Sequence, residues 1–246
     1  MAESLYDKFE IATLLGLVPG YIADTKFGRN ASIGTVQETI WDGGGLYTYL
    51  GHGVSDTLNV TSGSILDVNL VIRITGQDVS NVEFSEMVTL DATNPTTTPV
   101  VTIGKFHRVY KAEVISPRIN AGLISIISNA VGTPALAFIS IGEGRTQMAL
   151  YTVPRGKTLI IKDAIATIQG SKIGTVRART RSPLMSGFVT QRVYDISAGI
   201  PPRTPINAVI PERHDYELTA VTALSTAGFS VNLFTILIDN DVLIGR

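Results

Sequence analysis

The residues best suited to catalysis or metal binding are three histidines, His52, His107 and His214. Histidine is the commonest base for activating a nucleophile and a frequent zinc ligand. The local sequences GHG, FHR and RHD contain no HExxH motif or other closely spaced ligand pair. The chain also has no cysteine, which excludes thiolate nucleophiles, cysteine zinc sites and disulfides. We therefore expect structural histidines, and we predict no catalytic residue, no metal and no cofactor.

Two short motifs match binding loops only in part. Residues 142–144, GEG, are followed neither by the Gly-Lys-Ser/Thr of a phosphate loop nor by the rest of a GxGxxG dinucleotide pattern. A plain turn is expected there. Residues 239–241, DND, could bind calcium through oxygen atoms, but they lack the glycine and the distal glutamate of an EF-hand loop. We expect them to be solvated polar residues.

A row of three arginines, Arg177, Arg179 and Arg181, is the sharpest local charge feature. Side chains two positions apart on a strand point the same way, about 7 Å apart, so the row predicts a basic strip. The strip could contact carboxylates of a neighbouring protein or phosphates, or it could be a solvated face. Nucleic-acid binding is disfavoured, because 20 basic and 21 acidic residues leave a net charge of −1 and no aromatic residues alternate with the arginines.

The N-terminal part of the chain predicts a short helix followed by an extended arm. Within residues 3–16, apolar side chains recur at spacings of three and four, and Gly16 ends this pattern. Residues 20–45 then place isolated large apolar side chains on glycine-containing, irregular chain. Such an arm could lie over another subunit or tuck against its own domain. The predicted partner-binding residues of this region are Leu5, Phe9, Tyr21, Phe27, Arg29 and Trp41.

The remainder of the chain shows short strands separated by turn residues. Leu70, Ile72 and Ile74 alternate with polar and smaller residues, which is typical of a half-buried strand. A Pro-Arg-Gly-Lys turn at residues 154–157 predicts a hairpin at a domain junction. We predict an all-β fold: two antiparallel β-sandwich (jelly-roll-like) units in tandem, after an N-terminal arm and short helix. The predicted domains are residues 1–45, 46–148 and 149–246, although one continuous fold stays open.

The composition is consistent with a protein that is part of a larger assembly. Hydrophobic residues make up 44% of the chain and charged residues only 17%, below the quarter typical of soluble domains. Either a large β core or apolar surface kept for partners explains these values. No apolar run reaches the roughly 18 residues of a membrane span, and charged residues interrupt the N-terminus where a signal peptide would be apolar. We expect the protein to be synthesised in a cytoplasm and to have no contact with a membrane.

Several segments resemble a family of virion structural proteins of tailed bacteriophages, especially the capsid-decoration or minor-capsid β-sandwich proteins of marine and freshwater phages. These segments are KFGRN at 26–30, IWDGGGLYTY at 40–49, ITGQD at 74–78, KFHRVYKAEV at 105–114, NAG at 120–122, IGEGRTQMALYTVPRGKTLII at 141–161, TVRARTR at 175–181, IPERHDYELTA at 210–220 and FTILIDND at 234–241. The apolar runs LVIRI and LISII depart from the pattern.

The resemblance implies a non-enzymatic particle component present in many copies, with an arm that reaches a neighbouring subunit. Its implied partners are itself, as a homo-oligomer with a trimer as one option, and the major capsid protein or other virion proteins. Its implied location is the virion, assembled in the host cytoplasm. A tail, baseplate or vertex position stays open, with host-glycan binding by Trp41, Tyr47 and Tyr49. A glycan-processing enzyme would need two carboxylates about 5 to 10 Å apart, which no spacing identifies.

Overall fold

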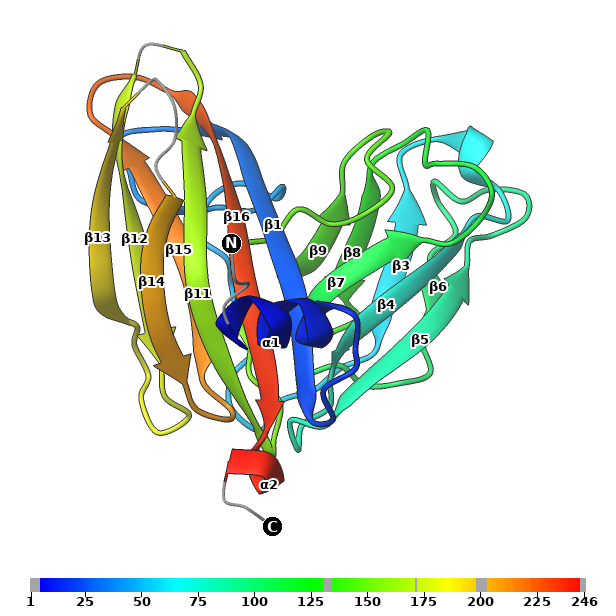
Figure 1. Ribbon diagram of the computed structural model, residues 1–246. Coiled ribbons are helices and arrows are strands. Elements are labelled where there is room, and N and C mark those ends of the chain that lie inside the picture. The colour runs from blue at the N-terminus through cyan, green and yellow to red at the C-terminus, as the bar shows by residue number, and fades with distance from the viewer. Residues whose placement is uncertain (1–4, 131–133, 171, 198–202, 244–246) are drawn as a thin grey trace.

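The protein is almost entirely β-structure, arranged in two lobes (Figure 1). This computed structural model describes residues 5–130, 134–170, 172–197 and 203–243. We call residues 20–41 together with 148–243 the large lobe, and residues 42–147 the small lobe. The predicted all-β fold is confirmed. No helix among the described residues is long and apolar enough to cross a membrane.

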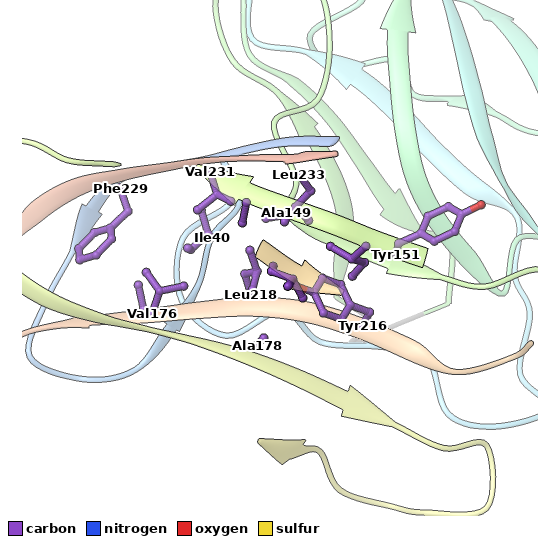
Figure 2. Packing of buried hydrophobic residues seen from close by; sticks show 14 of the residues in the cluster. Ile40, Ala149, Tyr151, Val176, Ala178, Tyr216, Leu218, Phe229, Val231 and Leu233 are labelled. Atoms are coloured by element: carbon purple, nitrogen blue, oxygen red, sulfur yellow. The ribbon is translucent and has the colours of Figure 1, made fainter. Parts of the chain in front are cut away.

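The large lobe consists of two antiparallel sheets packed face to face. The first sheet has the order β1 (Tyr21–Ile33), β16 (Ala227–Asp239), β11 (Lys157–Ile168) and β14 (Arg203–Ile210). The second has the order β10 (Leu150–Thr152), β15 (Asp215–Thr222), β12 (Ile173–Arg181) and β13 (Val189–Ser197), and β2 (Glu38–Thr39) also pairs with β15. Figure 2 shows the core between them, where Phe229 and Val231 of β16 lie opposite Val176 and Leu218. Alternating apolar residues on facing strands build this core.

The small lobe is an insertion within the large one. Trp41 and Met148 form an isolated antiparallel bridge, and the Ala149 amide donates to the Ile40 carbonyl at 2.9 Å. The chain therefore leaves the large lobe after Ile40 and returns at the adjacent position. On either side of this exit, β2 and β10 both pair with β15, as two parts of one interrupted strand.

The structure of residues 21–33 shows that two predictions, the extended arm and the tandem order of the domains, were wrong. These residues form β1, whose register with β16 runs from Tyr21 opposite Ile238 to Ile33 opposite Ala227. This segment is thus a strand of its own sheet and not an extended arm, and the two lobes are nested where a tandem order was expected. Sequence alternation missed β1 because Ile22 is exposed, whereas Lys26 and Gly28 occupy half-buried and buried positions where apolar residues were sought. Gly28 is needed there, since a Cβ atom would lie 2.4 Å from the Ala149 backbone nitrogen.

The small lobe has two further antiparallel sheets around its own core. One has the order β6 (Val100–Val101), β3 (Leu58–Ser62), β8 (Ile124–Ser128) and β9 (Ala135–Ile139), and the other the order β5 (Glu83–Thr89), β4 (Val71–Gln77) and β7 (Arg108–Val114). A short 3-10 helix covers Ile65–Asp67. Leu70, Ile72 and Ile74 are fully buried, which confirms the predicted alternation.

The turn at residues 154–157 connects two sheets and does not form the predicted hairpin. Gly156 has a φ of +77°, and the Lys157 amide donates to the Pro154 carbonyl at 3.2 Å, so the turn itself is confirmed. The strands on its two sides separate, because β10 pairs with β15 whereas β11 pairs with β14 and β16. The chain therefore crosses from one layer of the large lobe to the other at this point.

Two α-helices lie outside the sheets in the part of the chain that the structure describes. Helix α1 (Leu5–Leu14) confirms the predicted N-terminal helix, and α2 (Asn240–Leu243) follows β16 directly. In Figure 1, α1 crosses in front of β16 and β1. Phe9 anchors it by an edge-to-face contact with Tyr21, with ring centroids 5.3 Å apart.

Candidate functional site

Helix α1 and the residues directly after it expose several large apolar side chains. We call Phe9, Ile11, Leu14, Leu15 and Leu17 the α1 patch; their exposed fractions run from 40% for Phe9 to 69% for Leu17. One turn beyond Phe9, Thr13 is buried and donates its hydroxyl to the Phe9 carbonyl. A ten-residue helix is marginal in water on its own, so this segment gains from a covering partner.

The residues on α1 and β1 that were predicted to contact a partner differ in how exposed they are. Phe9 belongs to the α1 patch, whereas the side chain of Leu5 lies outside what the structure describes. Tyr21 and Phe27 are half-buried on β1. Arg29 reaches the small lobe, where it pairs with Glu143 at 3.6 Å. Sequence reasoning missed Ile11, Leu14 and Leu17, because it followed the stripe at Leu5, Phe9 and Ala12; the signal was the continuous apolar content around the helix.

Trp41 is a core residue of this chain. It is 4% exposed, its indole nitrogen donates to the Gly44 carbonyl at 2.9 Å, and its ring packs edge-to-face on Tyr47 with centroids 5.0 Å apart. Tyr47 is 6% exposed and donates its hydroxyl to the Leu136 carbonyl. The tail or vertex alternative required these side chains to stack on a glycan. Because both are buried, neither is available for that contact.

The arginine row is turned toward partners within the chain. Arg177 lies 3.5 Å from the amide oxygen of Gln37, Arg179 lies 3.5 Å from a carboxylate oxygen of Glu217, and Arg181 donates to Asp215 at 2.9 Å. The common direction predicted from the spacing is therefore seen. The carboxylates that meet the second and third arginines come from β15 of the same chain, however, and not from a neighbouring protein.

Asp215 is the centre of a buried ionic cluster between the lobes. Arg108 of the small lobe donates to both of its oxygens, at 3.0 and 3.3 Å, and the Thr152 hydroxyl donates at 2.5 Å. The side chains of Arg108 and Asp215 are only 4% and 3% exposed. The Arg108 guanidinium also donates to the carbonyls of Leu50 and His107. Since each buried charge meets a hydrogen-bonding partner, the cluster fixes the two lobes against one another.

Two aromatic rings cover this cluster. The Arg181 guanidinium lies 4.5 Å from the ring centroid of Tyr49 and 4.8 Å from that of Phe188, and Arg108 lies 5.1 Å from Tyr49. The Tyr49 hydroxyl donates to Glu217 at 3.2 Å. We call Tyr49, Arg108, Arg179, Arg181, Asp215 and Glu217 the junction network. The rings exclude water and thereby strengthen the ion pairs beneath them.

The two carboxyls of the junction network differ in their affinity for protons. Burial by itself would raise the pKa of Asp215, but the Arg108 and Arg181 guanidiniums hold it below its usual range. Burial raises the pKa of Glu217 to about 7, because Arg179 and Tyr49 offset only part of the desolvation. The bidentate contact with Arg108 thus keeps the pKa of Asp215 low, whereas the 3.5 Å ion pair with Arg179 is too weak to prevent the rise in the pKa of Glu217.

His107 and His214 lie on different lobes, and each contacts a backbone carbonyl. His107 is buried with Nδ1 at 2.6 Å from the Val54 carbonyl, and burial lowers its pKa. His214 is half-buried on the other lobe, with Nδ1 at 3.0 Å from the Glu212 carbonyl. Across residues 5–130, 134–170, 172–197 and 203–243, no three His, Cys, Asp or Glu side chains are placed to hold a metal ion.

Comparison with known proteins gives matches to solved structures but none from the two sequence searches. No protein-family model matches the chain, and no curated protein matches its sequence. Among solved structures, it is similar to VP2 of infectious bursal disease virus in a subviral particle, at 11% identity and a TM-score of 0.26, over 93% of this chain and 74% of that one. A T=1 particle derived from the same virus gives 12% identity and a TM-score of 0.28, over 95% and 75%. Both scores are low, and this likeness identifies neither a family nor a function.

Proposed function

We propose that the chain is a virion structural protein of a tailed bacteriophage that associates with further copies of itself through the α1 patch. The exposed apolar side chains of that patch are the observation that carries the proposal, since soluble monomers seldom leave so many neighbouring leucines in water. The junction network supports a non-enzymatic role, because its charges are engaged in holding the lobes together.

The strand order of the large lobe supports a jelly roll, an architecture of viral capsid and lectin domains. Its two sheets are β1-β16-β11-β14 and β2/β10-β15-β12-β13, and the chain changes sheets between β1 and β2, β10 and β11, β11 and β12, β13 and β14, β14 and β15, and β15 and β16. Such a double-layered unit with an inserted lobe offers a rigid body for packing into a lattice. The bacteriophage assignment rests on the sequence segments that resemble that family.

Within the particle, we favour binding to the capsid lattice in a decoration or minor-capsid role. Many modest contacts repeated over a lattice add up, because each tethered contact raises the effective concentration of the next. A tail, baseplate or vertex component that contacts host glycans is the second candidate. Quantitative mass spectrometry of purified particles separates them: hundreds of copies indicate a lattice, whereas about six or twelve indicate a tail or vertex. Absence of the chain from particles would overturn both.

Self-association is tested by changing two leucines of the α1 patch. We expect Leu14→Ser with Leu15→Ser to weaken association of the full chain by about tenfold or more, since each exposed leucine contributes apolar area to the contact. Sedimentation velocity over a concentration series measures it. The matched control is Leu184→Ser with Leu224→Ser, because these leucines are 95% and 91% exposed elsewhere on the molecule. A wild-type chain that stays monomeric, or an equal effect of both double variants, would contradict the proposal.

A further inference from the structure

A cleft of about 400 Å³ lies between the lobes and has no role in the proposed assembly. Its walls come from β1, β11 and β16 of the large lobe and from β4, β5 and β7 of the small lobe. The volume falls within the range of about 300–1,000 Å³ typical of small-molecule sites. A ligand here would contact both lobes at once.

The charges that line the cleft are balanced. They are Asp24, Glu83, Glu113, Lys26, Arg73 and Lys111, three acidic and three basic. Glu113 pairs with Arg73 at 2.8 Å and with Lys111 at 3.1 Å, so these three side chains satisfy one another. Lys26, Asp24 and Glu83 form no ion pair within 4.0 Å in the part of the chain that the structure describes. The groups left for a ligand are therefore one ammonium and two carboxylates.

Lys26 is held in place without a charged partner. Its ammonium lies 4.7 and 4.5 Å from the ring centroids of Tyr110 and Tyr151, and it donates to the Tyr110 carbonyl at 3.2 Å. Burial lowers the pKa of Lys26 to about 8, because Asp24 and Glu83 offset only part of the desolvation. An ammonium has three donors, so capacity for an added acceptor remains.

The deeper part of the cleft is mostly apolar, and two tyrosines that line the cleft, Tyr110 and Tyr216, have hydroxyls without a hydrogen-bond partner among the described residues. Leu159, Ile161 and Leu233 line it together with Tyr216. Tyr216 is 2% exposed, and among the described residues its hydroxyl has no hydrogen-bond partner. A buried hydroxyl without a partner costs free energy that a polar ligand atom can recover. The cleft thus combines an apolar floor, two tyrosine hydroxyls without partners and a rim with both donors and acceptors.

We propose that this cleft binds a neutral saccharide. A sugar hydroxyl both donates and accepts, so adjacent hydroxyls can accept from Lys26 while they donate to Asp24 and Glu83. The carbon-bound faces of the sugar would meet the apolar floor. An anionic or cationic ligand fits less well, because it would bring a charge of its own beside a like charge on the rim.

This inference deepens the glycan-binding option of the proposed function, and it locates that contact away from Trp41 and Tyr47. It also stands apart from assembly, since sugar binding and incorporation into particles are measured separately. A chain that binds sugar but is absent from particles would retain this inference and overturn the virion role. A chain that is present in particles but binds no sugar would overturn this inference and leave the virion role standing.

Saturation-transfer NMR on the full chain tests the proposal. The probes are glucose, galactose and N-acetylglucosamine, with galacturonate and choline as charged comparators. We expect at least one neutral sugar to receive saturation, with an affinity that falls about tenfold or more in Glu83→Gln, because a hydrogen bond to a charged acceptor is weakened. Glu143→Gln is the matched control, since Glu143 pairs with Arg29 outside the cleft. It should leave binding unchanged.

The result that overturns the proposal is equally specific. It would be no transfer to any neutral sugar, stronger binding of either charged probe, or equal affinity in wild type and Glu83→Gln. If Glu83→Gln loses its native circular dichroism, Ser85→Arg replaces it. Ser85 is exposed on the wall of the cleft, so a longer side chain would fill the space without disturbing the core. Unchanged sugar affinity in Ser85→Arg would then overturn the proposal.

Discussion

The junction network and the α1 patch reverse the usual distribution of polar and apolar side chains. At the junction, Arg108 and Asp215 are buried and engaged in hydrogen bonds, whereas in the α1 patch the leucines at 14, 15 and 17 are more than 60% exposed. Buried charges are tolerated only when they are paired, and exposed leucines gain when they are covered. The polar groups of the junction network find their partners within the chain, whereas the apolar side chains of the α1 patch are left without a covering surface.

The contrast also separates two roles for the N-terminal segment. Helix α1 contributes few buried side chains, but β1 supplies Ile33 and Asn30 to the interior of the large lobe. One continuous stretch of sequence therefore contains both a removable surface element and an integral strand. Truncation at two points can tell these roles apart.

Deletion of residues 1–33 should have the largest effect. It removes β1, which leaves the inner side chains of β16 at a new sheet edge, and we expect cooperative unfolding of the large lobe to be lost. Deletion of residues 1–17 should keep the cooperative transition, because the sheet stays intact. Urea unfolding followed by tyrosine fluorescence and circular dichroism measures both. Similar unfolding curves for the two truncations would show that the division at Tyr21 is mistaken.

Asp215→Ala should have the next largest effect. It leaves the Arg108 guanidinium buried without its carboxylate, which costs about 3–5 kcal/mol of unfolding free energy. The control is Asp195→Ala, since Asp195 is an exposed residue of β13 that accepts a hydrogen bond from the Thr175 hydroxyl, and a loss of about 0.5 kcal/mol is expected. Equilibrium urea denaturation checks the difference.

A triple variant sharpens the same point. Replacing Arg108 and Arg181 with Met and Asp215 with Leu removes all three charges together, and it should restore most of the lost stability because no unpaired charge is left behind. A triple variant as unstable as Asp215→Ala would mean that packing, and not the unpaired guanidinium, explains the loss.

Local sequence patterns predicted the elements of the fold better than their connections. Alternation identified the core face at Leu70, Ile72 and Ile74, and spacing identified α1. The pairing of β1 with β16 joins residues about two hundred positions apart, and no local pattern contains that information. The same reason explains why the nested order and the bridge between Trp41 and Met148 were not foreseen.

The candidate sites were predictable only in part. The direction of Arg177, Arg179 and Arg181 followed from strand geometry, but the position of Asp215 and Glu217 opposite them depends on the register of β12 with β15. The partner of Asp215 from the other lobe, Arg108, could not be found from sequence at all. The cleft around Lys26 likewise exists only because an inserted lobe folds back over β1.

Glu217→Gln tests whether the junction network contains an acid that favours its neutral form. Burial raises the pKa of Glu217 from 4.5 to about 7 in the folded protein. Between these two values the folded state binds more protons than the unfolded state, so stability should fall as pH rises, by roughly 3–4 kcal/mol in total. This contribution is fully present below pH 4.5 and lost above about pH 7.

The Glu217→Gln variant should flatten that slope, because glutamine keeps an acceptor for the Tyr49 hydroxyl without a charge to bury. Burial also raises the pKa of Asp42 to about 7, so Asp42→Asn should remove a separate part of the same pH dependence. Asp215 acts in the opposite sense, since its lowered pKa makes stability fall only as the pH drops below its usual range. Unfolding free energies measured from pH 4.5 to 8 distinguish these groups. If Glu217→Gln keeps the wild-type slope, Glu217 is ionised in the folded protein and its pairing with Arg179 is stronger than the 3.5 Å distance implies.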